Sequence, residues 1–445
     1  MRLTEGRTER IRGGFLEAIR EEIQDAQTAR NLIHLIREFD PDEIERLAAC
    51  LEDGKGQIGQ TVAQNLSMLQ RDRISRSLKS GRRTVAVYFP TAAYREHVAG
   101  LRPRLREAGY NVITVLGMVC DDRYEQDSNT HFGGHCGSIE LVNTWDFVDL
   151  FITPVLATDL PASARKVYVL HDIHDSPLGD EQTTLEISRK LQEYDYIYAP
   201  SPPVVEMFRR VVPLANPTNG VRKPVSIIPG GYMKLDRFID YFEAHRQEAK
   251  SLIYAPTVTG YGLDDVGSVV RHGEQIVGAL LEAAPDHELI FRPHPHSLTH
   301  PAVQAIIHTH RDNPRFTLDD DASFYMDSYS RARLMVSDIS GTAFTYAFGT
   351  LRPVVFCSFS ETLVQERYGH LRYVRDRKRI GRIVEDVEGL VRDVQTILGS
   401  MTGAAVDVRD YRDEAIYNVG KAEDYFVEHF TDMLEGRLLP EWVVA

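Results

Sequence analysis

A short apolar run at residues 333–337 ends in Asp338 and leads to Ser340, Gly341 and Thr342, where we expect a helix to begin. Such a strand-to-helix turn presents free backbone N–H groups, two hydroxyls and the positive end of a helix dipole at one point. Gly341 would let an anion approach the backbone closely. Asp338 is expected either to cap the helix or to accept a ribose hydroxyl. The sequence therefore predicts a phosphate or pyrophosphate site at this turn.

Four further apolar runs end in polar residues. In an open parallel sheet a ligand lies beyond the carboxyl ends of the strands. A single polar end of this kind is usually a turn, whereas five ends at one sheet edge predict a binding cleft. The candidates are His171, Asp172, His174 and Ser176 after KVYVL, Gly230, Gly231 and Lys234 after PVSII, Thr257 after SLIYA, and Arg292 and His294 after HELIF.

The elements that must position these residues change in pattern along the chain. Residues 14–78 have apolar positions at helical spacing and no evident strand. From residue 83, apolar strands alternate with helix-length intervals, and a second such set follows residues 236–250. The pattern predicts an α/β fold with two Rossmann-like parallel-sheet lobes facing a cleft. We expect a helical extension at 1–80, an N-terminal lobe at 81–245, a C-terminal lobe at 246–410 and C-terminal helices at 411–445.

Composition limits the classes of function. The net charge of −14 over 445 residues argues against a general nucleic-acid binder. Four scattered cysteines without a CxxC pair, a charged N-terminus and the lack of a long apolar stretch predict a cytoplasmic protein, at most peripheral to the inner face of the membrane. The helices at 1–80 are expected to mediate homo-oligomerisation or to approach a membrane acceptor.

Two histidine-containing segments could be read as metal sites. The first has no cysteine or carboxylate partner at finger-like spacing, and the second reads better as a glycine-rich loop near the acceptor cleft, so no metal is predicted. The two sets are His294, His296 and His300, and His131, His135 and Cys136.

Five motifs carry a family resemblance, in order, over roughly residues 165–360. The chain resembles the CDP-glycerol glycerophosphotransferases, which build teichoic-acid-like and capsule polymers and have the GT-B fold of two Rossmann-like lobes. The matching motifs are HDSPLG at 174–179, GGYMKLD at 230–236, YAPT at 254–257, RPHP at 292–295, and SDISGTAFTYAF at 337–348 followed by RPVVF.

The resemblance implies roles for the candidates. His174 takes the position of the catalytic base, a task that suits an imidazole near neutral pH, and His171 is the competing histidine of that loop. His294 would support the departing nucleotide. Arg292 and Lys234 would contact phosphate oxygens. Thr257, Ser340, Gly341 and Thr342 would also hold the donor, Gly230 and Gly231 would line the cleft, and His171, Asp172 and Ser176 would lie on the acceptor side.

The expected function is metal-independent, inverting transfer of a polyol-phosphate group. A CDP-linked donor would be the substrate, a hydroxyl of a glycan or lipid-linked acceptor would attack, and no cofactor would be required. Gly179, Met233, Gly341 and the segment 258–261 depart from the family pattern at positions near donor or acceptor. A glycosyltransferase that uses a CMP- or UDP-linked sugar is therefore the alternative. A sugar-nucleotide 2-epimerase and a non-catalytic binding protein are further alternatives.

Overall fold

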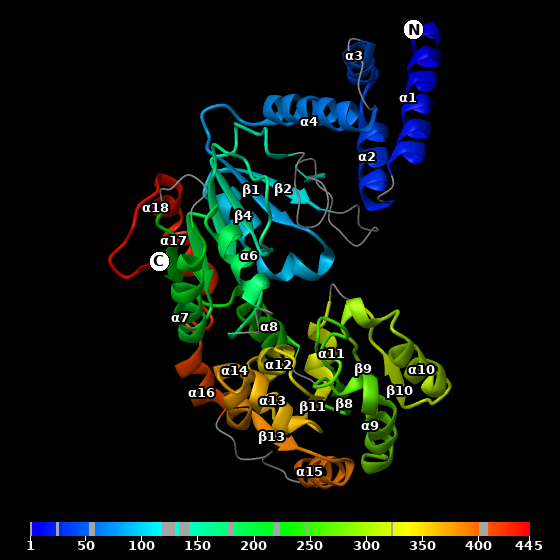
Figure 1. The fold of residues 1–445 in the computed structure, drawn as a ribbon, viewed down its shortest axis with the longest axis vertical. Coiled ribbons are helices and arrows are strands. Elements are labelled where there is room, and N and C mark those ends of the chain that lie inside the picture. The colour runs from blue at the N-terminus through cyan, green and yellow to red at the C-terminus, as the bar shows by residue number, and fades with distance from the viewer. Residues whose placement is uncertain are drawn as a thin grey trace.

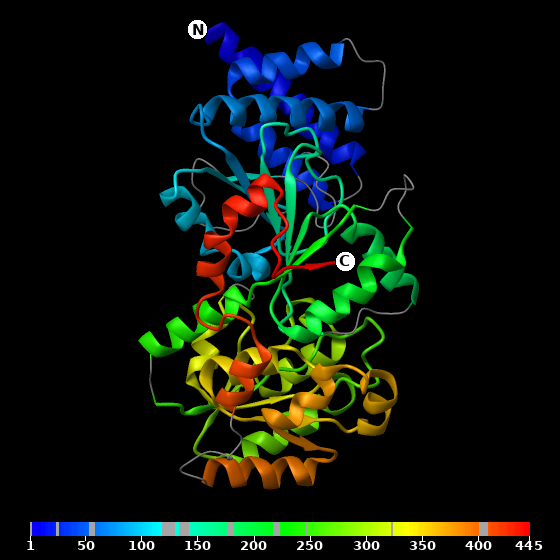
Figure 2. The same cartoon turned by 90° about the vertical axis from the view of Figure 1, so that its left-hand side faces the viewer.

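Two α/β lobes are stacked along the long axis of the molecule, and a group of helices extends from one end (Figures 1 and 2). The structure is a computed structural model. It describes residues 2–23, 26–52, 58–117, 130–132, 142–175, 181–216, 223–245, 248–321, 324–399 and 408–445.

Four helices form the N-terminal extension: α1 (Arg2–Glu22), α2 (Ala26–Glu38), α3 (Pro41–Glu52) and α4 (Ile58–Ser77). Asp40 and Glu43 start α3 by a reciprocal capping arrangement, because each side chain accepts a bond from the backbone N–H of the other, at 2.8 and 2.9 Å. Ile36 and Leu47 are fully buried and belong to the apolar cluster that also contains strand residues of the N-terminal lobe. The extension therefore packs as part of that lobe's core.

The N-terminal lobe is built on a sheet with the order β14-β7-β6-β5-β4-β1-β2-β3. All neighbouring strands are parallel except the pair β14 and β7. The order reverses between β1 and β4, which makes the carboxyl ends of these strands a topological switch point. The strands are β1 (Thr84–Phe89), β2 (Asn111–Leu116), β3 (Thr130–Phe132), β4 (Leu150–Thr153), β5 (Arg165–Val169), β6 (Tyr196–Ala199), β7 (Ser226–Pro229) and β14 (Val443–Val444).

The C-terminal lobe has a six-stranded, entirely parallel sheet with the order β10-β9-β8-β11-β12-β13. This is the Rossmann order, and its switch point lies between β8 and β11. The strands are β8 (Ser251–Tyr254), β9 (Glu288–Phe291), β10 (Phe316–Leu318), β11 (Ala332–Ser337), β12 (Val354–Cys357) and β13 (Gly381–Val384). The two sheets confirm the predicted α/β fold with two Rossmann-like lobes.

Helices cover both sheets and complete the lobes. In the N-terminal lobe they are α5 (Leu101–Glu107), α6 (Glu181–Leu191) and α7 (Pro202–Val211). In the C-terminal lobe they are α9 (Val269–Ala283), α10 (Pro301–His310), α11 (Met326–Arg331), α12 (Thr342–Thr350), α13 (Glu361–Tyr368), α14 (Arg372–Arg375) and α15 (Val387–Gly399). None of the helices described is long and apolar enough to cross a membrane.

Two segments connect the lobes. Helix α8 (Met233–Ala244) buries Leu235 and Phe238 in the apolar cluster of the C-terminal lobe, so that core begins before residue 246. The C-terminal segment begins with α16 (Val408–Ala415), which packs on α12. It then returns to the N-terminal lobe as α17 (Ala422–Glu428), α18 (Phe430–Glu435) and β14, so residues 411–445 include a strand as well as helices.

Candidate functional site

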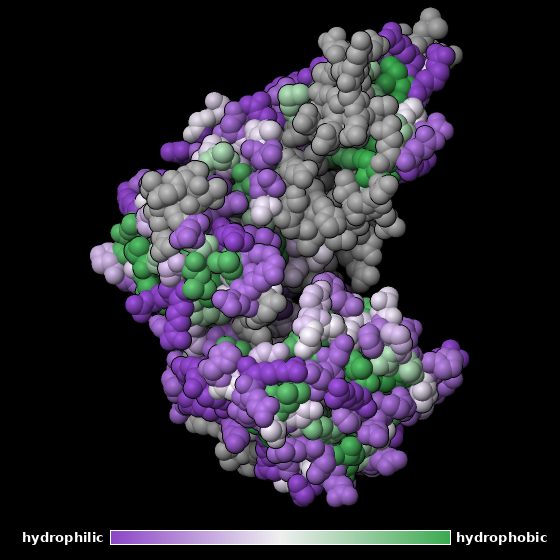
Figure 3. Space-filling model, in the orientation of Figure 1, coloured by the Kyte–Doolittle hydropathy of each residue, from purple (hydrophilic) through white to green (hydrophobic). Residues whose placement is uncertain are grey.

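The start of α12 faces the N-terminal lobe. Oδ1 of Asp172, in the loop after β5, lies 3.9 Å from the position that a Cβ atom on Gly341 would occupy. Within the part of the chain that the structure describes, the backbone N–H groups of Gly341 and Thr342 make no hydrogen bond. These N–H groups and the positive end of the helix dipole are available to an anion. The surface is indented at the right of Figure 3, where the two lobes meet.

Lys234, at the start of α8, provides a cation close to this turn. Its Nζ lies 4.7 Å from the centroid of the Tyr325 ring. Burial lowers the pKa of Lys234 to about 8; the charge of Arg292 lowers it further, whereas the charge of Asp172 raises it. At neutral pH most Lys234 side chains therefore carry the charge that would attract a phosphate.

His294, after β9, is exposed to solvent. Its Nδ1 accepts the backbone N–H of His296 at 3.2 Å, so the neutral ring carries its proton on Nε2 and can donate it to a ligand. Loss of hydration around the imidazole lowers the pKa of His294 to about 4, with the charges of His296, Lys234 and Arg292 acting in the same direction. We call Asp172, Lys234, His294, Gly341 and Thr342 the interlobe site.

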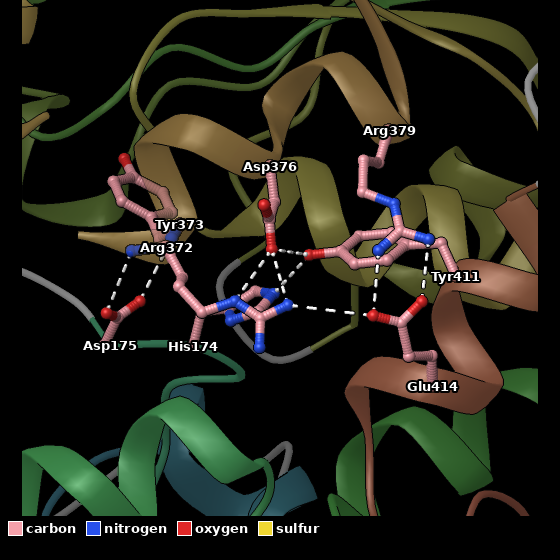
Figure 4. Close-up of polar contacts among 8 residues, drawn as sticks. All are labelled: His174, Asp175, Arg372, Tyr373, Asp376, Arg379, Tyr411 and Glu414. Carbon is pink, nitrogen blue, oxygen red and sulfur yellow. Dashed lines mark hydrogen bonds and ion pairs between the residues drawn. The ribbon is translucent and has the colours of Figure 1, made fainter. Parts of the chain in front are cut away.

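His174 is buried at the junction of the lobes, with 1% of its surface exposed. Its Nε2 lies 3.1 Å from the hydroxyl of Tyr411 on α16, and that hydroxyl donates to Asp376 at 2.8 Å (Figure 4). The guanidinium of Arg372 also donates to Asp376, at 3.0 Å. Burial lowers the pKa of His174 to about 4, while Asp376 raises it and Arg372 lowers it. The imidazole is therefore neutral at physiological pH.

Asp175 fastens the same loop to the C-terminal lobe. Its two carboxylate oxygens accept the backbone N–H groups of Arg372 and Tyr373, each at 3.0 Å (Figure 4). These are donors in the first turn of α14, where a carboxylate is favoured by the exposed N–H groups. Two consecutive side chains of this loop, His174 and Asp175, thus form hydrogen bonds with the C-terminal part of the chain.

Asp338, one of the predicted nucleotide contacts, instead bonds to neighbouring loops inside the C-terminal lobe. It is fully buried, and its two oxygens accept bonds from the backbone N–H groups of Thr257, Ser268 and Ile339 and from the hydroxyl of Ser268, at 2.7–2.9 Å. Both oxygens are already engaged by the protein. Asp338 therefore joins the loops after β8 and β11, and Thr257 is held in place by its backbone rather than presented freely.

Arg292, predicted to contact phosphate oxygens, makes contacts within the C-terminal lobe. Its guanidinium lies 2.6 Å from a carboxylate oxygen of Asp319 and donates to the backbone oxygen of Asp321 at 2.9 Å. Thr342 contacts the hydroxyl of Tyr329 through its own hydroxyl. Ser340 is partly exposed beside the turn. Arg292 thus acts on the interlobe site through its charge in this arrangement.

Gly230 and Gly231, predicted to line the cleft, pack closely against other parts of the protein. A Cβ on Gly230 would lie 2.0 Å from the ring of Tyr198. Gly231 has φ of 108°, and a Cβ there would lie 2.5 Å from the backbone oxygen of Tyr417. Gly230 is needed because the Tyr198 ring on β6 packs against it, and Gly231 is needed because the returning C-terminal segment packs against this turn.

Of the remaining predicted acceptor-side residues, the structure describes His171 but not Ser176. His171 lies with its Nδ1 2.9 Å from the backbone oxygen of Pro154 and its ring edge-on to Tyr94, so its ring is a packed group beside the site. Ser176 lies outside the described residues, as do His135 and Cys136. Across the described ranges, no group of three or more histidine, cysteine, aspartate or glutamate residues is arranged to hold a metal.

A cavity of about 600 Å³ adjoins the His174 loop, between α7 and the segment from α13 to α14. It combines apolar walls with arginine and histidine side chains. Its lining includes Asp175, Pro203, Met207, Arg210, Arg367, Tyr368, His370, Leu371, Arg372 and Arg375. Such a lining suits a ligand with both an anionic and an apolar part.

Sequence reasoning missed the residues that hold His174. Tyr411, Asp376 and Arg372 lie in the last quarter of the chain, beyond the five motifs, and nothing in their spacing indicates that they meet a loop more than 190 residues earlier. The charged run at 375–382 was the one sequence feature that could have drawn attention to this region. Its Arg377 is fully buried and pairs with Glu361 at 2.8 Å, so this run is partly interior.

No family model matches the chain, and no curated protein matches its sequence. Solved structures do match. The wall teichoic acid polymerase TagF superposes with a TM-score of 0.58 at 13% identity, over 90% of this chain and 100% of that chain. A TagF structure soaked with CDPG gives 0.57 at 13% identity, over 89% and 99%.

A protein described as a UDP-N-acetylglucosamine 2-epimerase from Listeria monocytogenes also matches, with a TM-score of 0.55 at 14% identity, over 81% of this chain and 99% of that chain. These likenesses establish the two-lobed GT-B fold. They include the kind of polymerase that the five motifs of this chain resemble, so the sequence and the fold point to the same class of structure.

Proposed function

We propose that the chain is a transferase that moves a polyol-phosphate group from a CDP-linked donor to a hydroxyl acceptor in the synthesis of a cell-surface glycopolymer. The observation that carries the proposal is the approach of Asp172, from one lobe, to the start of α12 in the other, with Lys234 and His294 within electrostatic reach. The same fold in TagF, one structure of which was soaked with CDPG, supports a CDP-linked donor.

In this proposal the donor pyrophosphate binds at the N-terminus of α12. The N–H groups of Gly341 and Thr342 and the ammonium of Lys234 would offset its charge. The Nε2–H of His294 would donate to the oxygen on which charge develops as CMP leaves. Asp172 would stay on the acceptor side, where its charge disfavours a second phosphate and suits a hydroxyl.

His174 is proposed to take the proton from the attacking hydroxyl. Its Nδ1 is buried and has no hydrogen-bond partner within the described structure. We propose that the lobes move apart at the His174 and Asp175 contacts to admit the acceptor to this atom. We propose that Lys234 and the N–H groups of α12 can offset the donor charge without a metal, and we expect chelators to leave turnover unchanged.

Transfer of a sugar from a CMP- or UDP-linked donor is the second candidate. The epimerase from Listeria monocytogenes, named for a UDP-linked sugar, has the same two-lobed fold, and this likeness supports a nucleotide sugar as the alternative donor. Both reactions need a base, a bound pyrophosphate and a stabilised leaving group. The identity of the nucleotide therefore distinguishes them.

A thermal-shift panel of CMP, CDP, UDP and GDP tests the donor directly, because a ligand that binds the folded state raises its melting temperature. We expect CDP to give the largest shift. The location is tested by Gly341→Asp, which places a carboxylate where the phosphate would bind, against Gly341→Ser, which adds a similar side chain without charge. Room for a Cβ exists at Gly341. We expect Asp to weaken CDP binding more than tenfold and Ser to retain it; equal binding by both variants would rule out this position.

Peripheral membrane association and oligomerisation are proposed for α1 to α4. The solution mass with and without residues 1–80 tests the oligomer. Because these helices share the apolar core of the N-terminal lobe, circular dichroism of the shortened protein must accompany the measurement.

A further inference from the structure

Three side chains from three separate segments form a linear chain at the junction of the lobes (Figure 4). His174 comes from the loop after β5, Tyr411 from α16, and Asp376 from the 3-10 turn Asp376–Arg379. The distances are 3.1 Å from His174 Nε2 to Tyr411 Oη and 2.8 Å from Tyr411 Oη to Asp376 Oδ2. His174 and Tyr411 are each 1% exposed, so water does not compete for these bonds.

The proton positions in the hydrogen-bonded series of His174, Tyr411 and Asp376 follow from which of these groups can donate a proton. A tyrosine hydroxyl has one proton, and an ionised carboxylate can only accept. The Tyr411 proton must therefore lie toward Asp376, since two oxygens 2.8 Å apart without a shared proton would repel each other. Tyr411 Oη is then the acceptor for His174, whose proton lies on Nε2. The lone pair of the neutral imidazole is consequently on Nδ1, the atom that has no partner in the structure described.

The surroundings hold Tyr411 and Asp376 in place. Arg372 donates twice to Asp376, at 3.0 and 3.2 Å. The guanidinium of Arg379 lies 4.1 Å from the centre of the Tyr411 ring and pairs with Glu414 at 2.8 Å. Burial and the neighbouring Asp376 raise the pKa of Tyr411, so its hydroxyl keeps its proton. The hydroxyl is thus fixed in both position and direction.

We propose that Tyr411 and Asp376 are positioning residues that fix the tautomer of His174 with its lone pair on Nδ1 and stabilise the imidazolium formed when Nδ1 takes a proton. This inference rests on the proposed transfer reaction. In that reaction the acceptor O–H bond breaks, and its electron pair forms the new bond to the donor phosphorus. The proton goes to Nδ1, and CMP leaves with the electron pair of the broken P–O bond. Nε2–H remains donated to Tyr411 throughout.

The kinetic test compares Tyr411→Phe and Asp376→Asn with Tyr417→Phe. Tyr417 is the matched control, because its hydroxyl makes no hydrogen bond to any described residue and its side chain is only partly buried. We expect kcat to fall about tenfold to a hundredfold in the first two variants, the range for loss of a hydrogen bond to a charged group. The donor KM should stay within about twofold. Equal kcat in Tyr411→Phe and Tyr417→Phe would overturn the proposal.

The pH profile separates positioning from a merely structural effect. Asp376 raises the pKa of His174, and Arg372 lowers it. Removal of the carboxylate in Asp376→Asn should therefore move the acid limb of kcat to lower pH. A lower kcat with an unmoved limb would show that the variant only damages the fold. Asp376→Asn also keeps the test decisive if Tyr411→Phe does not fold.

Nitrogen NMR of the wild-type protein tests the tautomer without any substrate. We expect His174 to show a protonated Nε2 and an unprotonated Nδ1, and we expect Tyr411→Phe to give a mixture of tautomers. A wild-type proton on Nδ1 would overturn the proposal. If the wild-type protein transferred nothing from any donor, the proposed function would fail, whereas the NMR result would still decide how Tyr411 and Asp376 position His174.

Discussion

The two histidines assigned to the reaction are held in opposite ways. His174 is buried, and a hydrogen-bonded chain from the other lobe fixes its ring. His294 is exposed, and its ring accepts a hydrogen bond from the backbone N–H two residues later. A base must present one lone pair in one direction, whereas a group that stabilises a leaving nucleotide must meet a ligand that enters from solvent. The difference in support therefore matches the difference in proposed role.

The largest effect is expected from the buried histidine. His174→Gln removes the base but keeps a side chain of similar size, and we expect kcat to fall by about 10²–10⁴. Donor affinity, measured by titration calorimetry, should be retained because the donor binds to the other lobe. Turnover equal to that of Tyr417→Phe would show that His174 is not the catalytic base.

His294→Ala should have the next largest effect, a fall in kcat of about 10²–10³, the range for loss of one donor to a developing charge. His294→Gln should recover part of the rate, since its amide can donate near the position of Nε2. His296→Ala is the matched control and should stay near wild type. A loss as large in His296→Ala as in His294→Ala would instead favour a metal site in this segment.

Lys234→Met tests whether the cation near His294 serves the donor. We expect the donor KM to rise about tenfold to a hundredfold, because a charge-assisted contact to phosphate is lost. Since the pKa of Lys234 is lowered to about 8, donor affinity should decline as the pH rises through 8. Lys234→Arg cannot lose its charge in that range and should abolish this decline. A decline that persists in Lys234→Arg would assign the titration to another group.

Asp338→Asn should act on the fold of the C-terminal lobe. The carboxylate accepts four bonds while fully buried, and the NH2 of an Asn amide would face N–H donors there, so we expect a loss of roughly 1–3 kcal/mol in the free energy of unfolding for each donor left unpaired. Chemical denaturation measures it. Asp264→Asn is the control, because Asp264 accepts the backbone N–H of Gly260 at a less buried position, and it should change stability by less than about 1 kcal/mol.

The smallest effect is a pH dependence of stability from His174. Its pKa is lowered to about 4 in the folded protein from 6.5. Between these values the unfolded chain binds the proton and the folded chain does not, so the stabilisation is complete above pH 6.5 and is lost as the pH falls toward 4. The contribution amounts to at most about 3 kcal/mol. His174→Gln should show a shallower loss than wild type over this window; identical slopes would mean that the ring protonates freely in the folded state.

Local patterns predicted the architecture well. Apolar strands at helix-length intervals predicted the two sheets of the structure. The ends of β5, β9 and β11 carry Asp172, His294 and Gly341, as the rule for open sheets requires. These features depend on residues close together in sequence, which is why a single sequence carries them.

The remaining site depends on contacts between distant segments. Gly230 and Asp338 have the residue types of ligand contacts, yet one packs under Tyr198 and the other accepts backbone N–H groups. Tyr411 meets His174 only because the chain crosses back between the lobes at α16. Spacing cannot reveal such a meeting, since neither residue type nor periodicity indicates the partner.

The most direct test of the central claim is a crystal structure of the protein with CDP bound. We expect the β-phosphate to lie within hydrogen-bond distance of the Gly341 and Thr342 N–H groups and of Lys234 Nζ, with His294 beside it. CDP bound instead in the cavity between α7 and α14, with the start of α12 left empty, would contradict this placement of the donor.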